Sequence, residues 1–204
     1  MSFQTSLWTG LLGIGATIAL VQPIAAAKSS VEIGKTAQAI TVLITEPNNV
    51  GSGVILQRQG EIYTVLTAAH VIKNKANYTI TTPDDRKYQI ISSSIRSAPG
   101  SIDLAVVKFK STTSYPTAKL GNCNALERGM ELYVGGFPGT SRAITESIFV
   151  FREGKVSANS NKVLENGYSL VYSNDTLPGM SGGAVLNSEG ELVAIHGRGD
   201  RDRN

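Results

Sequence analysis

Beyond residue 36, short apolar runs rich in Val, Ile, Tyr and Thr alternate with turn residues along the chain. The first run is "AITVLI" at 39–44, and "LAVVKF" at 104–109 is the last before a Ser/Thr-rich stretch. No long segment repeats its apolar positions every 3.6 residues, as an amphipathic helix would. Further runs occupy 53–57, 62–68, 78–82, 88–92, 131–137, 148–156, 168–172, 184–187 and 191–197. Strands of this kind at this spacing predict an all-β sandwich or barrel.

The stretch "KSTTSYPTAKLGN" at 110–122 has the composition of a linker between two β halves. It predicts an N-terminal domain over 28–112 and a C-terminal domain over 113–204. The 204 residues, 41% of them hydrophobic, are enough to bury a core in such an arrangement.

Residues 1–27 contain no charged side chain, and the segment from Leu7 to Val21 is apolar apart from small residues. Ala25, Ala26 and Ala27 supply small residues before Lys28, as at the cleavage site of a signal peptide. We expect export with cleavage after Ala27, which places the protein in the periplasm or outside the cell. The alternatives are an anchor formed by residues 7–27 and a buried helix.

Composition narrows the classes of function. A net charge of +3 and scattered basic residues give little support to nucleic-acid binding. Cys123 is the only cysteine, so no intrachain disulfide can form, and we expect it to be a buried small apolar residue. No His pair or Cys cluster has metal-ligand spacing, so we expect neither a metal nor a cofactor.

The stretch "LPGMSGGAV" at 177–185 has three interpretations. It is a tight turn, a G-x-S-x-G nucleophile elbow, or the serine loop of a trypsin-type protease. An elbow requires alternating strands and helices, with the acid and the histidine on separate loops after the serine. Downstream of Ser181 the only histidine is His196, and the acids before it, Glu189 and Glu191, lie too close in sequence. The elbow is therefore the weakest interpretation.

The chain has only two histidines, and one of them, His70, ends an apolar run in "VLTAAHVI". Asp103 directly precedes the apolar run "LAVVKF". Taken singly, His70 is as easily a satisfied core residue, and Asp103 a strand-end or turn residue. Together with Ser181 they follow the order His, Asp, Ser, with the first two in one β half and the serine in the other. This is the order found in trypsin-type proteases.

On these residues the chain resembles the chymotrypsin-fold, trypsin-like serine protease family. The resemblance rests on "TAAH" around His70, "DLAVV" from Asp103, "GMSGG" around Ser181 and "GSGVI" at 51–55. It implies two six-stranded Greek-key β-barrels with the active site in the cleft between them. It also implies a serine endopeptidase acting on proteins or peptides, with His70 as base, Asp103 as its partner and Ser181 as nucleophile. The backbone N–H groups of Gly179 and Ser181 would form the oxyanion hole.

The same resemblance places a substrate pocket around Asp175, Thr176, His196, Gly197 and Gly199. Asp175, six residues before Ser181, would favour Lys or Arg at P1. His196 in "AIHG" is similar to the histidine of bacterial glutamyl endopeptidases and would favour Glu, with Thr176 adding a hydroxyl. The two roles conflict in one pocket, because an ionised Asp175 would repel a substrate Glu. We expect basic P1 residues, since the Asp175 carboxylate is charged at any pH above its own pKa, whereas His196 must first be protonated to bind Glu.

Two departures from the family pattern limit these expectations. Met180 stands where well-known members carry an Asp that pairs with a new N-terminus, so we expect no such activation switch. The chain also stops soon after its last matched strand, so it is either a fragment of a longer protease or has a second barrel that closes incompletely. A catalytically incompetent binding module is therefore the runner-up function.

Overall fold

The computed structural model describes residues 28–199 apart from positions 48, 141, 143 and 161. The predicted signal peptide, residues 1–27, lies outside the described residues. Within the described part, no helix is both long and apolar enough to span a membrane.

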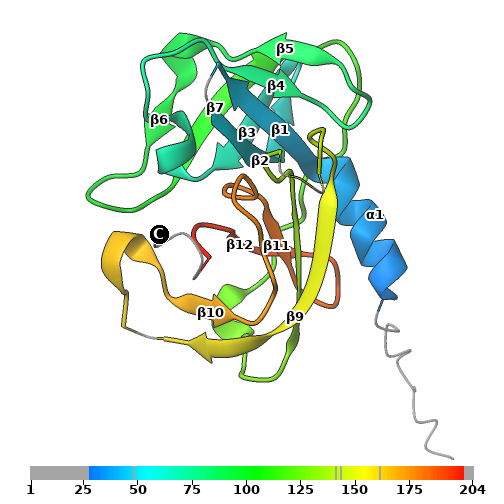
Figure 1. The fold of residues 1–204 in the computed structure, drawn as a ribbon, viewed down its shortest axis with the longest axis vertical. Helices are drawn as coiled ribbons and strands as arrows, with labels where there is room; N and C mark the ends of the chain where they lie inside the picture. Colours follow the sequence, from blue (N-terminus) through cyan, green and yellow to red (C-terminus); the bar gives the residue numbers. More distant parts are fainter. Residues whose placement is uncertain (1–27, 48, 141, 143, 161, 200–204) are drawn as a thin grey trace, which may run out of the picture.

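Two antiparallel sheets form the two halves of the molecule, one above the other in Figure 1. The first sheet has the order β5-β4-β1-β2-β3-β7-β6 and the second the order β10-β9-β8-β11-β12. The first sheet consists of β1 (Thr41–Glu46), β2 (Asn49–Gln59), β3 (Ile62–Thr67), β4 (Thr79–Thr81), β5 (Lys87–Gln89), β6 (Arg96–Ser97) and β7 (Ala105–Lys110). The second consists of β8 (Glu131–Gly136), β9 (Val150–Asn159), β10 (Leu170–Tyr172), β11 (Ala184–Leu186) and β12 (Leu192–Ile195).

The prediction of an all-β protein built from two barrel-like halves is confirmed, with two corrections. The described sheets have seven and five strands rather than six each. One α-helix, α1 (Ser30–Ile40), precedes the first strand, although the sequence pattern suggested none.

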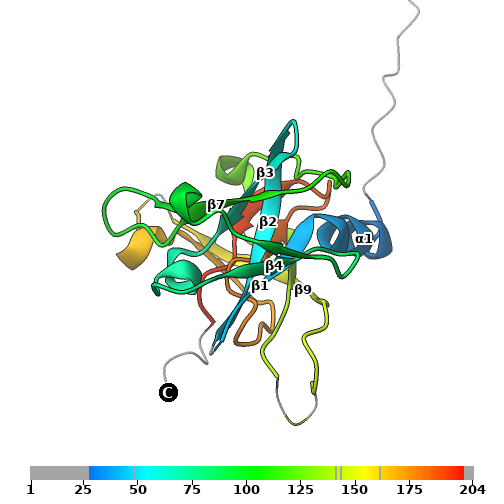
Figure 2. The ribbon, with the colours of Figure 1, turned by 90° about the horizontal axis from the view of Figure 1, so that it is seen from above.

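The cause of α1 is local. Ser29 caps the helix through its side chain, which accepts from the N–H of Glu32, and Glu32 returns the bond to Ser29. Ile33, Ala37 and Ile40 lie on one buried face and pack against β8 and β11 of the second sheet. Figures 1 and 2 show the helix running along the side of the two sheets. The predicted strand at 39–44 therefore begins only at Thr41, where the helix ends.

The core of the first half is aromatic. Phe109 of β7 is fully buried, and its ring stacks on Tyr63 with centroids 5.0 Å apart. Tyr88 and Tyr115 pack against the same ring. The alternation of buried and more exposed positions along β7 places Phe109 on the inner face of the sheet.

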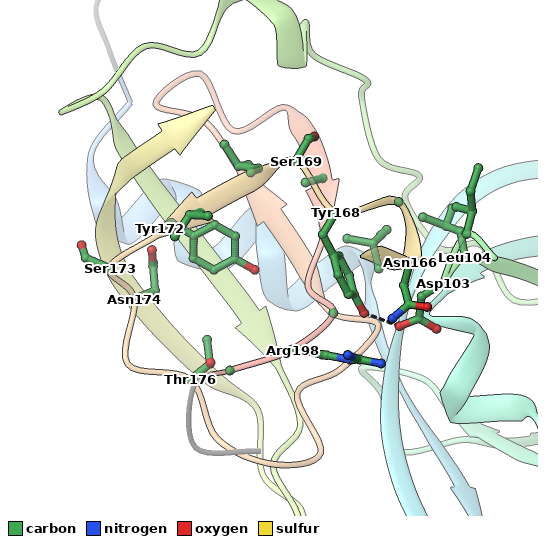
Figure 3. A pocket seen from close by; sticks show the side chains of 18 of the residues that line it. Asp103, Leu104, Asn166, Tyr168, Ser169, Tyr172, Ser173, Asn174, Thr176 and Arg198 are labelled. Atoms are coloured by element: carbon green, nitrogen blue, oxygen red, sulfur yellow. Dashed lines mark hydrogen bonds between the residues drawn. The ribbon is translucent and has the colours of Figure 1, made fainter. Parts of the chain in front are cut away.

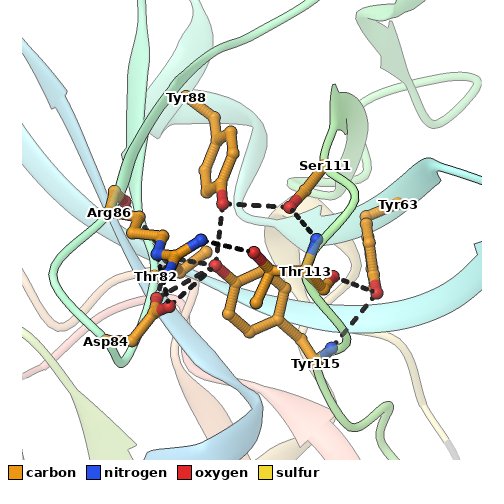
Figure 4. Close-up of polar contacts among 8 residues, drawn as sticks. All are labelled: Tyr63, Thr82, Asp84, Arg86, Tyr88, Ser111, Thr113 and Tyr115. Atoms are coloured by element: carbon orange, nitrogen blue, oxygen red, sulfur yellow. Dashed lines mark hydrogen bonds and ion pairs between the residues drawn. The ribbon is translucent and has the colours of Figure 1, made fainter.

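A polar network next to this aromatic core anchors the chain where it leaves the first sheet (Figure 4). The Tyr115 hydroxyl donates to Asp84, and Arg86 pairs with the same carboxylate at 3.2 Å. The Tyr88 hydroxyl bonds to that of Tyr115 at 2.8 Å and accepts from Ser111. The start of the 110–122 segment is thus tied to the turn between β4 and β5.

Cys123 differs from the sequence prediction. It is exposed rather than buried, and it begins a short 3-10 turn, Cys123–Ala125, on the surface. The turn is capped by the side chain of Asn122, which accepts from the N–H of Asn124. A turn held by its own polar groups needs no burial of the thiol.

Candidate active site

His70 and Asp103 are brought together by the pairing of β3 with β7. The two strands are antiparallel, with Thr67 opposite Ala105. His70 lies three residues beyond Thr67, on the 3-10 turn Ala69–Ile72, and Asp103 lies two residues before Ala105. Both side chains therefore emerge at the same end of the strand pair, where the Nδ1 of His70 is 2.7 Å from Oδ2 of Asp103.

The carboxylate of Asp103 is well buried, with 9% of its side chain exposed, whereas the His70 side chain is 38% exposed. Oδ1 of Asp103 accepts from the backbone N–H of His70 at 2.9 Å. Its Oδ2 accepts from the Tyr168 hydroxyl as well as from the imidazole. Burial alone would raise the pKa of Asp103, but the hydrogen bonds from His70 and Tyr168 outweigh it and hold that pKa well below its usual range. The carboxylate is therefore charged at neutral pH.

The serine loop is fixed from both halves of the molecule. The N–H of Ser52 in β2 donates to the Ser181 carbonyl at 2.7 Å, and the N–H of Gly182 donates to the His196 carbonyl at 2.7 Å. Gly182 has φ +88°, and a Cβ there would lie 2.0 Å from the Ser52 carbonyl oxygen. Only glycine allows this conformation and this close approach.

The peptide before Gly179 has a defined orientation. The Pro178 carbonyl accepts from the N–H of Gly139 at 2.8 Å. Because a trans peptide directs its C=O and N–H to opposite sides, the N–H of Gly179 points away from Gly139. Gly179 adopts φ +95°, and Met180 anchors the loop with a fully buried side chain.

Two adjoining cavities surround these residues. One, of about 620 Å³, is lined by His70, Gly179 and Ser181. The other, of about 560 Å³, is lined by four of the five predicted pocket residues, Asp175, Thr176, Gly197 and Gly199. The structure thus brings His70 and Ser181 into one cavity, although the Ser181 hydroxyl donates to the Gly197 carbonyl at 2.8 Å.

Asp175 and His196 occupy different environments. Asp175 is exposed, and its backbone carbonyl accepts from Nε of Arg152. His196 is 2% exposed, and its Nδ1 lies 2.6 Å from the Tyr172 hydroxyl. Burial raises the pKa of Tyr172, which keeps that hydroxyl protonated at neutral pH.

Sequence reasoning missed Tyr168 and Arg198, which line both cavities. The Arg198 guanidinium lies over the Tyr168 ring at 5.7 Å (Figure 3). Tyr168 looked like the first residue of a strand, and no local motif marks either residue. Among the described residues no group of three or more His, Cys, Asp or Glu side chains could hold a metal ion.

Comparison with known proteins gives the class of this chain. Residues 51–195 match the family model described as "Trypsin-like peptidase domain". This segment is more than half of the 204 residues, and the chain belongs to the trypsin-like peptidase family. The prediction of a serine-type peptidase, a hydrolase, is confirmed at the level of this family.

Individual proteins similar to this chain share about a third or less of its residues. The proteins named "Serine protease HtrA-like" from Staphylococcus aureus strains USA300 and COL are each 31% identical to this chain over 160 residues. The match covers 72% of this chain and 20% of each relative, so the chain spans about a fifth of the length of these curated relatives. The solved structure "Crystal structure of Deg5" has a TM-score of 0.67 at 20% identity and covers 82% of this chain and 83% of that one. At this identity the likeness shows the fold alone.

Proposed function

We propose that this protein is a serine endopeptidase that uses His70, Asp103 and Ser181 as a catalytic triad. The observation that carries the proposal is the hydrogen-bonded His70–Asp103 pair facing the same cavity as Ser181. A serine hydroxyl is a weak nucleophile, so a neighbouring base must take its proton. Asp103 holds Nδ1 of the imidazole, which leaves Nε2 as the ring nitrogen for that transfer.

The reaction proceeds through an acyl-enzyme. The Ser181 hydroxyl turns from the Gly197 carbonyl toward His70, gives up its proton and attacks the scissile carbonyl carbon. The backbone N–H groups of Gly179 and Ser181 stabilise the oxyanion, and the orientation of the Pro178 carbonyl supports a hole formed before substrate binds. His70 then returns the proton to the leaving amine, and water hydrolyses the ester.

The direct test is labelling by a fluorophosphonate together with hydrolysis of a fluorogenic peptide. A triad enzyme is labelled at Ser181 in a His70-dependent way. The runner-up function, a binding module without catalysis, predicts peptide binding with neither labelling nor hydrolysis. Labelling that is unchanged in His70→Ala would contradict the triad.

We propose that the P1 side chain occupies the 560 Å³ cavity and that Asp175 gives a preference for Lys or Arg. The Asp175 side chain is exposed and reachable from that cavity, whereas His196 is buried with Nδ1 already bonded to Tyr172. Because the cation of Arg198 lines the same cavity, we expect a modest preference, roughly tenfold in kcat/KM. A P1-scanning library measures it, and Asp175→Asn should remove it. Preference for Glu that strengthens below about pH 6.5, the reference pKa of histidine, would assign the pocket to His196 instead.

We also propose that the protein is exported, on the composition of residues 1–27, and that residues 28–112 and 113–204 form its two domains. The two sheets, at 41–110 and 131–195, support a boundary between them, although α1, within residues 28–112, packs against the second sheet. N-terminal sequencing of exported material should begin at Lys28. A sequence that begins at Met1 would favour retention of residues 7–27 as an anchor.

A further inference from the structure

Asp103 receives a donor from the opposite half of the molecule. The Tyr168 hydroxyl donates to Oδ2 of Asp103 (Figure 3). The same oxygen faces Nδ1 of His70. Burial raises the pKa of Tyr168, and the bond to Asp103 raises it further, so this hydroxyl stays protonated and remains a donor. With the backbone N–H of His70 on Oδ1, both oxygens of the carboxylate are held.

Gly197 creates the space that Tyr168 fills. A Cβ at Gly197 would lie 2.2 Å from Cε1 of Tyr168 and 2.6 Å from its hydroxyl oxygen. The backbone of Gly197 lies outside the left-handed region, so the neighbouring ring rather than the backbone conformation opposes a side chain there. The Tyr168 ring therefore occupies the space that a side chain at position 197 would need.

The segment that carries Tyr168 is fixed against Asp103 by its backbone as well. The N–H of Asp103 donates to the Asn166 carbonyl at 2.9 Å. The Arg198 guanidinium lies over the Tyr168 ring. The ring of Tyr168 is thus bordered by the segment that contains Gly197 and Arg198, and its hydroxyl reaches a carboxylate of the first half.

We propose that Tyr168 is a positioning residue for the triad: its hydroxyl fixes the Asp103 carboxylate toward His70, and Gly197 is required because its side-chain position is occupied by the Tyr168 ring. This inference rests on the proposed function. It predicts that the hydrogen bond from Tyr168 to the acid of the triad forms only when the two halves are docked, since the donor and the acceptor belong to different halves.

The first test is Tyr168→Phe, which keeps the ring in place and removes only the hydroxyl. We expect kcat to fall about tenfold with KM changed less than twofold, because a hydrogen bond to a charged group is lost from the catalytic machinery. We also expect the acidic limb of the kcat/KM profile to move to higher pH. Without the Tyr168 donor, more of the Asp103 charge is available to stabilise the imidazolium of His70.

Charged and titratable neighbours define how that profile is interpreted. The charged and titratable side chains that line the two cavities with His70, Asp103 and Tyr168 are Glu165, Tyr172, Asp175 and Arg198. None of them is altered in Tyr168→Phe. A general disturbance of the fold would instead lower the midpoint of urea unfolding and raise KM, and it would leave the acidic limb in place. The direction of the shift therefore separates the two roles.

Tyr133→Phe is the matched control. It removes a tyrosine hydroxyl that donates to Glu131 on β8, in the same half but outside both cavities. We expect its kcat, KM and pH profile to equal those of the wild type.

The second test is a double-mutant cycle between positions 168 and 197. Gly197→Ser alone should lower kcat/KM by at least about 100-fold, since the new Cβ displaces the Tyr168 ring. In the Tyr168→Ala background the same substitution should instead raise kcat/KM several-fold, because the serine hydroxyl reaches the vacated position beside Asp103. Gly197→Ala in that background lacks the hydroxyl and should give no recovery.

The outcomes distinguish this inference from the proposed function. Loss of hydrolysis in Ser181→Ala combined with a Tyr168→Phe enzyme that matches the wild type in kcat and pH profile overturns the role of Tyr168 and leaves the triad intact. Additive effects of the two substitutions in the cycle also overturn it. Absence of fluorophosphonate labelling in the wild-type protein would contradict both the proposed triad and the proposed role of Tyr168.

Discussion

Ser181→Ala should lower kcat for peptide hydrolysis by about 10⁶, and Asp103→Asn by about 10⁴. The first change removes the proposed nucleophile. The second preserves the shape of the side chain but removes the charge that holds Nδ1–H of His70 and stabilises the imidazolium. A 10⁴-fold loss corresponds to about 5.5 kcal/mol of transition-state stabilisation. Steady-state kinetics with a fluorogenic peptide, after circular dichroism has shown unchanged folding, provide the measurement.

Members of the proposed triad would act as a unit, so the loss in a Ser181→Ala/Asp103→Asn double variant should be close to that of Ser181→Ala alone. Ser157→Ala on β9, an exposed serine in the same half, is the control and should keep wild-type kcat. Wild-type turnover by Ser181→Ala would remove Ser181 from the mechanism. Additive losses in the double variant would mean that the two residues do not act in one step.

Phe109→Ala should lower the free energy of unfolding by about 3–5 kcal/mol. The Phe109 ring is fully buried, stacks on Tyr63 and contacts Tyr88 and Tyr115, so its removal leaves a cavity among rings that pack in fixed orientations. This loss is a large part of the roughly 5–15 kcal/mol that stabilises a typical domain. Urea unfolding followed by circular dichroism measures this free energy, and the slope of the free energy against urea concentration should be compared between the variants.

Ile148→Ala is the control for this prediction, because Ile148 is 54% exposed and its truncation should change stability by less than about 0.5 kcal/mol. The free energy of unfolding of Phe109→Leu should lie between the values for Phe109→Ala and Ile148→Ala, since leucine leaves a smaller cavity than alanine. An unfolding midpoint of Phe109→Ala equal to that of the wild type would show that this cluster does not hold the first half together. Activity should fall with stability, since Asp103 lies two residues before the strand that carries Phe109.

The sequence was informative where a local pattern carries the signal. Short apolar runs rich in Val, Ile, Tyr and Thr, separated by turn residues, predicted each long strand to within a few residues, because these residue types favour strands. The motifs around His70, Asp103 and Ser181 led to the trypsin-like family, to which the chain belongs. The helix α1 had a local signal too, the capping box from Ser29 to Glu32, but its few turns carry too short an apolar period to stand out.

By itself the sequence determined the all-β class, the order of the candidate residues and the need for glycine in the serine loop, because these depend on neighbours along the chain. Only the tertiary structure decided that Cys123 is exposed, that Ser52 clamps the Ser181 carbonyl and that Tyr168 reaches Asp103. Tyr168 and Asp103 are 65 residues apart and belong to different halves. No local pattern encodes such a contact, since it arises only when the two sheets pack together and Gly197 leaves room for the side chain of Tyr168.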